Sequence, residues 1–226
     1  MGGTGKPLLR SALSAVLIAT TTFACSASTG ASGPATPAAG NAATGGARQA
    51  AVAGAAGIGD PDFPTDGNGG YDVAHYDLRL TYRPQTKRLD GTARIRATAV
   101  QRLARFNLDL HGLTVHGARV NGAAARVERS GDELTIIPAA PLERDAEFTV
   151  EIDYGGVPRP FRQPGALGTF GFVATPDGAF VACQPNGAKT WFPSNDHPLD
   201  KATYTFRLTV PEGLVAIANG EQVRPP

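Results

Sequence analysis

The stretch YDVAHYDLRLTY, residues 71–82, decides the fold class because its apolar and polar residues alternate. Successive side chains of a β-strand point to opposite faces, so a period of two indicates a strand with one buried and one solvated face. The expected buried face carries Ala74, Tyr76, Leu78, Leu80 and Tyr82, and the expected solvated face carries Val73, His75, Asp77, Arg79 and Thr81.

Four later stretches repeat this period: TARIRATA (92–99), RFNLDLH (105–111), EFTVEIDY (147–154) and TYTFRLTV (203–210). Between them stand turn signals, namely Asp90-Gly91, Asn121-Gly122 and SGDE (130–133), whose residues accept positive φ at low cost. Outside the first 25 residues no long apolar pattern has the helical period. Residues 70–226 are therefore predicted to form an all-β domain, a mostly antiparallel saddle or sandwich.

The N-terminus has the pattern of an export signal. Lys6 and Arg10 precede a short apolar run (12–24), and small residues follow. Cys25 stands where a bacterial lipoprotein signal places its lipidated cysteine, so residues 1–25 indicate either a lipid anchor on the outer side of the cell membrane or plain secretion. A buried N-terminal helix is the alternative. Two cysteines do not make a disulfide framework.

Residues 26–69 are rich in Ala, Gly, Ser, Thr and Pro and contain almost no large apolar residue. Such a segment buries too little apolar surface to offset its ordering entropy, so it is expected to be a disordered linker. The formal net charge of +1 gives no indication of a nucleic-acid partner.

Signals for catalytic chemistry are weak throughout the chain. The four histidines (His75, His111, His116 and His197) lie in neither a C-x-x-C nor an H-E-x-x-H motif, and no G-x-S-x-G elbow is present. Cys183 has no activating neighbour in the sequence, and His197 follows fourteen residues later. No catalytic residue and no metal ligand is therefore assigned.

The segment CQPNGAKTWFPSNDHPLDKATYTF (183–206) combines three prolines with the only tryptophan. Its prolines exclude a continuous helix. Asn195 and Asp196 are expected to bond neighbouring backbone amides, and Trp191 and Phe192 to pack beside the turn. The segment predicts a rigid polar loop. Gln184 is its one candidate for ligand binding, because an amide offers two donors and an acceptor.

The string QPNGAKTWFPSNDHPLDKATYTFRLTVPEGLVAIANG resembles the end of the N-terminal β domain in the aminopeptidase N family of zinc metallopeptidases, the gluzincin aminopeptidases, and is most similar to actinobacterial members. YDVAHYDLRLTY, LDGTARIRATA, FNLDLHGLTV and FTVEIDYGG agree in order, so the resemblance covers residues 70–226. It implies a saddle-shaped domain that closes one side of an active-site cleft. The family's G-x-M-E-N and H-E-x-x-H motifs, which belong to its zinc-binding catalytic domain, are absent from this sequence; Met1 is the sole methionine.

One family contact maps onto a residue of this chain. Many members use an acidic side chain of this domain to receive the free amine of the substrate, and the matching position is Gln184, which can supply only a neutral hydrogen bond. Asp196, Pro198, Lys201 and Ala202 match the family string as structural residues. Ser194 stands where relatives often have cysteine.

These observations favour the substrate-anchoring N-terminal domain of an exported zinc aminopeptidase, inert alone because the zinc-binding catalytic domain is missing. The expected partner is the N-terminus of a peptide; a membrane is reached only through lipid on Cys25. No cofactor is expected on this chain. Zinc is expected on the full-length enzyme. LVAIANGEQV (214–223) reads as a hairpin cut short, which indicates the front part of a longer protein. The alternatives are a stand-alone surface β module that binds peptides or proteins, and a decayed gene fragment.

Overall fold

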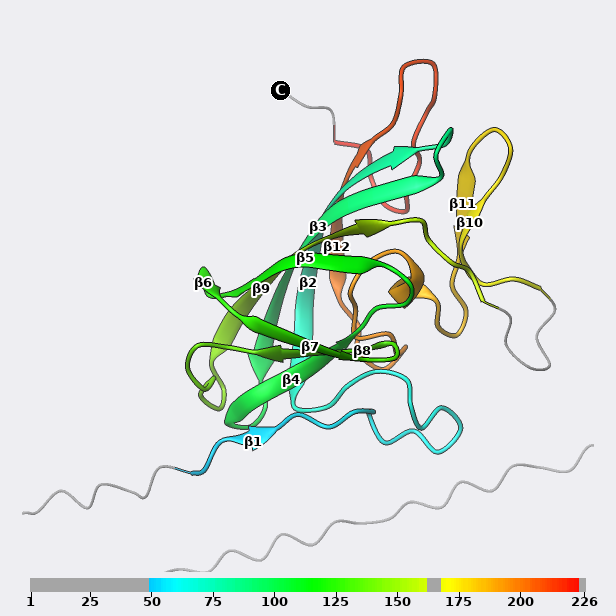
Figure 1. The fold of residues 1–226 in the computed structure, drawn as a ribbon. Helices are drawn as coiled ribbons and strands as arrows, with labels where there is room; N and C mark the ends of the chain where they lie inside the picture. The colour runs from blue at the N-terminus through cyan, green and yellow to red at the C-terminus, as the bar shows by residue number, and fades with distance from the viewer. Residues whose placement is uncertain (1–48, 162–167, 224–226) are drawn as a thin grey trace, which may run out of the picture. The chain divides into compact units, whose positions relative to one another are not determined.

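The computed structural model describes residues 49–161 and 168–223. The predicted export signal, Cys25 and the first half of the predicted linker lie outside these residues. Strands are almost the only regular secondary structure of the described part, which confirms the all-β class (Figure 1). No helix in it has the length and apolar character needed to cross a membrane.

The strands form three sheets. One has the order β12-β2-β3-β9-β5-β6, another β1-β4-β8-β7, and β10 pairs with β11. Their bounds are β1 Val52–Ala53, β2 Tyr71–Arg83, β3 Arg88–Ala99, β4 Leu103–Asp109, β5 Thr114–Val120, β6 Ala123–Ala124, β7 Arg126–Ser130, β8 Glu133–Ile137, β9 Glu147–Gly156, β10 Gly171–Ala174, β11 Ala179–Ala182 and β12 Thr203–Thr209, with a 3₁₀ turn, η1, at Ala188–Thr190.

Most neighbouring strands are antiparallel, as expected, but β12 runs parallel to β2 and β1 parallel to β4. The core lies between the six-stranded and four-stranded sheets, with β4, β7 and β8 in front of the larger sheet in Figure 1. The ring of Phe106 on β4 meets Tyr71 of β2 at 5.5 Å and Phe148 of β9 at 5.3 Å between centroids. These edge-on and tilted contacts join the two layers.

A β-bulge changes the predicted faces at the start of β2. Val73 pairs with Ala97 and His75 with Arg96, so Ala74 is the extra residue on its strand. Val73 is therefore fully buried and Ala74 exposed, the reverse of the prediction, because a bulge shifts the alternation by one residue. From Tyr76 onward the predicted faces are confirmed.

By the same alternation Tyr204, Phe206 and Leu208 are expected on the buried face of β12, but this face is partly open. Tyr204 is 46% and Leu208 36% exposed, because β12 ends the order of its sheet. Tyr204 stacks on Tyr76 at 5.1 Å and on Phe206 at 5.7 Å. The prediction of a buried face is thus wrong here, and an aromatic ladder on an edge strand takes its place.

Two turn predictions are confirmed and two are wrong. Asn121-Gly122 is a turn with positive φ at both residues, and Gly131 and Asp132 join β7 to β8. Asp90-Gly91 lies inside β3, where a Cβ on Gly91 would stand 2.7 Å from the Tyr154 ring, so close packing explains this glycine. LVAIANGEQV contains no strand in the described residues, since a hairpin without a sheet to join is marginal.

Residues 49–69 differ from the linker expected there. β1 pairs with β4, and the backbone N–H of Gly54 donates to the carbonyl of Arg105 at 2.8 Å. Further along, Asp66 is 7% exposed and Asn68 is fully buried. Polar partners on the β-domain, rather than apolar burial, hold this segment, and its composition gave no indication of them.

Candidate functional site

The loop that follows β11 carries Gln184, the one residue for which the sequence suggests ligand binding. Gln184 is exposed, and its side chain makes no hydrogen bond within the described residues. The Gln184–Pro185 peptide bond is cis. Two residues later the chain becomes buried at Asn186 and enters η1. The structure therefore presents an unpartnered amide at the border of a buried polar cluster.

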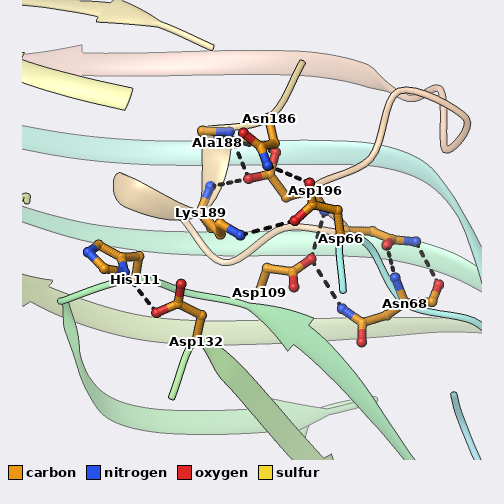
Figure 2. Close-up of polar contacts among 11 residues, drawn as sticks. Asp66, Asn68, Asp109, His111, Asp132, Asn186, Ala188, Lys189 and Asp196 are labelled. Carbon is orange, nitrogen blue, oxygen red and sulfur yellow. Dashed lines mark hydrogen bonds and ion pairs between the residues drawn. The ribbon is translucent and has the colours of Figure 1, made fainter. Parts of the chain in front are cut away.

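The carboxylate of Asp196 fixes the shape of this loop. It accepts hydrogen bonds from the backbone N–H groups of Gly187 at 2.9 Å, Lys189 at 3.1 Å and Ala188 at 3.2 Å (Figure 2). Burial is the largest influence on the pKa of Asp196 and raises it, although these three donors act in the opposite direction. The expectation that Asp196 bonds neighbouring amides is confirmed.

Asp66 holds the same loop from the opposite side. One of its oxygens accepts a hydrogen bond from Asn186 Nδ2, and the other lies 3.4 Å from Lys189 Nζ (Figure 2). Burial alone would lower the pKa of Lys189, but the charges of Asp66, Asp109 and Asp196 outweigh it and raise that pKa. The buried ammonium is thus compensated by several carboxylates, as a buried charge must be.

Asp109, at the end of β4, joins the two segments. Its Oδ2 accepts a hydrogen bond from Asn68 Nδ2 at 3.1 Å and another from the backbone N–H of Asp196 at 2.9 Å. Burial raises the pKa of Asp109 to about 7, and the nearby carboxylates of Glu133 and Asp196 act in the same direction. This carboxyl group therefore titrates near neutral pH.

His197 is a structural residue of this cluster. Its Nδ1 accepts the backbone N–H of Leu199 at 3.2 Å, which leaves Nε2 as the protonated nitrogen that donates to Asp60 at 3.2 Å. Its side chain is 1% exposed. Both ring nitrogens are in use, so His197 is not available to activate Cys183.

Cys183 is an exposed residue whose thiol is nonetheless surrounded closely enough to lose hydration. This desolvation raises its pKa to about 11. A nucleophilic cysteine needs a lowered pKa, so the geometry gives no support to a catalytic role.

The remaining histidines lie apart from one another. His75 bonds Thr203 at 2.7 Å, His111 bonds Asp132 at 2.8 Å, and His116 lines a hollow of about 400 Å³ on the six-stranded sheet. Within residues 49–161 and 168–223 no three His, Cys, Asp or Glu side chains are grouped so as to hold a metal ion. The described residues thus do not fit a zinc site.

Sequence reasoning missed the contribution of Asp60, Asp66 and Asn68. The signal that could have found it is the change of composition at DPDFPTDGNGG (60–70), where Asp, Asn and Pro interrupt the Ala- and Gly-rich run. Such residues form turns through side-chain bonds to backbone groups. Their partners on the loop, more than a hundred positions away, could not be read from composition.

Comparison with known proteins gives matching results for sequence and structure. Residues 73–224 match the model of the Peptidase M1 N-terminal domain. A leucine aminopeptidase 2 of Candida albicans is 28% identical over 143 residues, 60% of this chain and 22% of its own length. An M1 zinc metallopeptidase of Deinococcus radiodurans is 30% identical with a TM-score of 0.62, covering 70% of this chain and 38% of that one.

A mutant of the Deinococcus radiodurans enzyme bound to a Tyr-Ser-Ala substrate is 32% identical, with a TM-score of 0.61 over 70% of this chain and 38% of that one. A two-domain M1 zinc metallopeptidase mutant bound to L-arginine is likewise 32% identical, with a TM-score of 0.63 over 66% of this chain and 35% of that one. The chain thus spans between about a fifth and two fifths of the length of these relatives.

Proposed function

The chain belongs to the family of peptidase M1 N-terminal domains, and on this premise we propose that it anchors the N-terminus of a peptide substrate for an exported zinc aminopeptidase. The observation that carries the proposal is the exposed, unpartnered amide of Gln184 on a loop whose backbone is fixed by the buried Asp196. Because the backbone of the loop is already fixed, the conformational entropy lost on binding is mainly that of the Gln184 side chain.

The proposed contact is a hydrogen bond from the substrate's ammonium group to Gln184 Oε1. The amide carries no charge, so the bond is weaker than the same contact to a carboxylate. Gln184 Nε2 remains free to donate to a carbonyl of the peptide. The contact orients the substrate and makes or breaks no bond.

Hydrolysis is proposed to need more than these 226 residues. The sequence contains neither H-E-x-x-H nor G-x-M-E-N, and the described residues do not fit a zinc site. In the proposed enzyme a catalytic domain outside this chain holds the zinc ion. The chain by itself is proposed to be inert. Export, with or without lipid on Cys25, is proposed from residues 1–25. That the chain is of the actinobacterial type within the family stays a prediction.

The test is binding of Tyr-Ser-Ala and its N-acetyl form, measured by chemical-shift titration of the full chain at millimolar peptide. We expect the free amine to bind more tightly, by about threefold to tenfold for one hydrogen bond to an uncharged acceptor, and Gln184→Ala to remove that difference. Equal binding of both peptides to the wild type would refute the proposal. Cleavage of an aminoacyl-anilide by the chain with added zinc would refute the proposal that the chain alone is inert.

A further inference from the structure

We propose that Asp66 is a positioning residue for Gln184, acting through Asn186, so that the segment before β2 forms part of the peptide-binding loop. This inference rests on the function proposed above. Asp66 and Asn186 lie 120 positions apart, yet Asn186 Nδ2 donates directly to Asp66 Oδ2. Asn186 and Asp66 are 4% and 7% exposed, so water does not compete for this hydrogen bond.

Asp66 holds the loop at two points. Beyond its bond to Asn186, its other oxygen lies 3.4 Å from Lys189 Nζ, and that ammonium lies 5.7 Å from the centre of the Phe161 ring. Asn186 and Lys189 flank Gly187 and Ala188, whose N–H groups Asp196 binds from inside the loop. The turn is thus held between two carboxylates on different segments.

The path from Asp66 to Gln184 is short. Only Pro185, whose ring restricts φ, separates Gln184 from Asn186. Gln184 itself has no side-chain partner in the described part of the chain. The backbone at Gln184 is held on one side by β11, which ends at Ala182, and on the other side by Asn186, whose described side-chain contact is the one with Asp66.

The segment has contacts with the domain besides those of Asp66. The backbone N–H of Asn68 donates to Asn195 Oδ1 at 2.5 Å, and Asn195 Nδ2 returns a bond to the carbonyl of Asn68 at 3.1 Å. Asn68 Nδ2 also binds Asp109. Removing the Asp66 carboxylate should free the loop at Asn186 while these three bonds keep residues 66–68 on the domain.

The experiment measures amine preference, defined as the dissociation constant for N-acetyl-Tyr-Ser-Ala divided by that for Tyr-Ser-Ala, on the full chain. We expect Asp66→Ala and Asn186→Ala to reduce this ratio to the value of Gln184→Ala, a loss of about threefold to tenfold. Adding Asp66→Ala to Gln184→Ala should change it no further, because both act on one contact. Asp66→Asn keeps an oxygen for Asn186 Nδ2 and should retain the ratio within about twofold.

The matched control is Asn107→Ala. Asn107 is a buried amide on β4 whose Oδ1 accepts a hydrogen bond from Thr135 Oγ1 of β8 at 2.8 Å, so its side-chain bond goes to the neighbouring strand and not to the loop. Loss of the Asn107 side chain should lower the stability of the fold and leave amine preference intact. The variant thus distinguishes a general loss of stability from mispositioning of Gln184. If Asp66→Ala does not fold, Asn186→Ala tests the positioning role instead, because it keeps the ion pair of Asp66 and Lys189.

The outcomes separate the two proposals. If Gln184→Ala leaves amine preference unchanged, the proposed function fails. If Gln184→Ala removes the preference while Asp66→Ala or Asn186→Ala retains it, the positioning role fails and the anchoring role stands. Loss of the preference in Asp66→Asn would also overturn the route through Asn186, because the hydrogen bond is preserved there.

Discussion

The Asp66 carboxylate lies 3.4 Å from the ammonium group of Lys189, although 123 positions separate the two residues. Both side chains are about one-tenth exposed. This pair joins a segment whose composition indicates a linker to the loop that carries Gln184. The N-terminal boundary of the β-domain therefore lies before Asp66 and not at residue 70.

Gly67 is a point of close approach between the two segments. Its φ is +67°, and a Cβ there would stand 2.6 Å from His197 Cβ. We expect Gly67→Ala to lower the free energy of unfolding by about 1–3 kcal/mol more than Gly122→Ala, measured by urea denaturation. Gly122 is the matched control, because it also has positive φ but open space around it. Equal losses in the two variants would contradict the close contact.

Asp196 and Ser194 lie in one loop and are both buried, but of their two side chains only that of Asp196 accepts hydrogen bonds from backbone donors in the described residues. Asp196→Ala leaves three N–H groups without their acceptor, and we expect a loss of about 2–4 kcal/mol in unfolding free energy. Ser194→Ala removes a hydroxyl that has no partner among the described residues, so its effect should stay within about 0.5 kcal/mol or be stabilising. Denaturant melts of both variants test this; similar losses would show that the bonds to Asp196 contribute little.

Asp109 should make stability depend on pH near neutrality. Burial raises its pKa from 3.8 to about 7, so between these values the folded state keeps a proton that the unfolded chain has released. The contribution of Asp109 to the free energy of unfolding therefore falls as pH rises from about 4 to 7. Above about pH 7 it no longer changes. In Asp109→Asn this contribution is absent, while those of Glu133 and Asp196 are shared with the wild type.

We therefore expect the wild type to lose on the order of 1–4 kcal/mol relative to Asp109→Asn between pH 4.5 and pH 8, in urea titrations at each pH. A constant difference between the two proteins over this range would show that the carboxyl group is already ionised at low pH.

Cys183 should react slowly with thiol reagents despite its exposure. Its pKa of about 11 lies two units above the ordinary value of 9.0, so the thiolate fraction at pH 8 is about a hundredfold smaller than that of a free thiol. Iodoacetamide labelling followed by mass spectrometry of the Cys183 peptide measures the rate. We expect labelling to accelerate strongly in denaturant; equal rates in folded and unfolded protein would contradict the raised pKa.

The sequence predicts the strands better than it predicts how the strands are joined and what surrounds them. Alternation identifies the buried face of β3 and β9 correctly, because both lie inside the sheet with one covered face. It is wrong at Val73, where a bulge shifts the period, and at Tyr204, where the strand is an edge. Both errors come from pairing partners, which a local pattern does not contain.

The candidate site is predictable only in its loop. Asp196 and Gln184 stand out by residue type within residues 183–206, and the turn bonds of Asp196 follow from its position. The bonds of Asp66 to Asn186 and of Asn68 to Asn195 join residues more than a hundred positions apart, and no periodicity links such pairs. Buried polar networks of this kind depend on tertiary placement, so composition gives no sign of them.

The most direct measurement of the central claim follows the side-chain amide signals of Gln184 in ¹H–¹⁵N spectra of the full chain. On addition of Tyr-Ser-Ala we expect these two signals to shift with a millimolar dissociation constant, and on addition of the N-acetyl peptide to stay nearly fixed. If the peptide with a free amine moves other signals while those of Gln184 remain in place, this residue does not receive the substrate's amine.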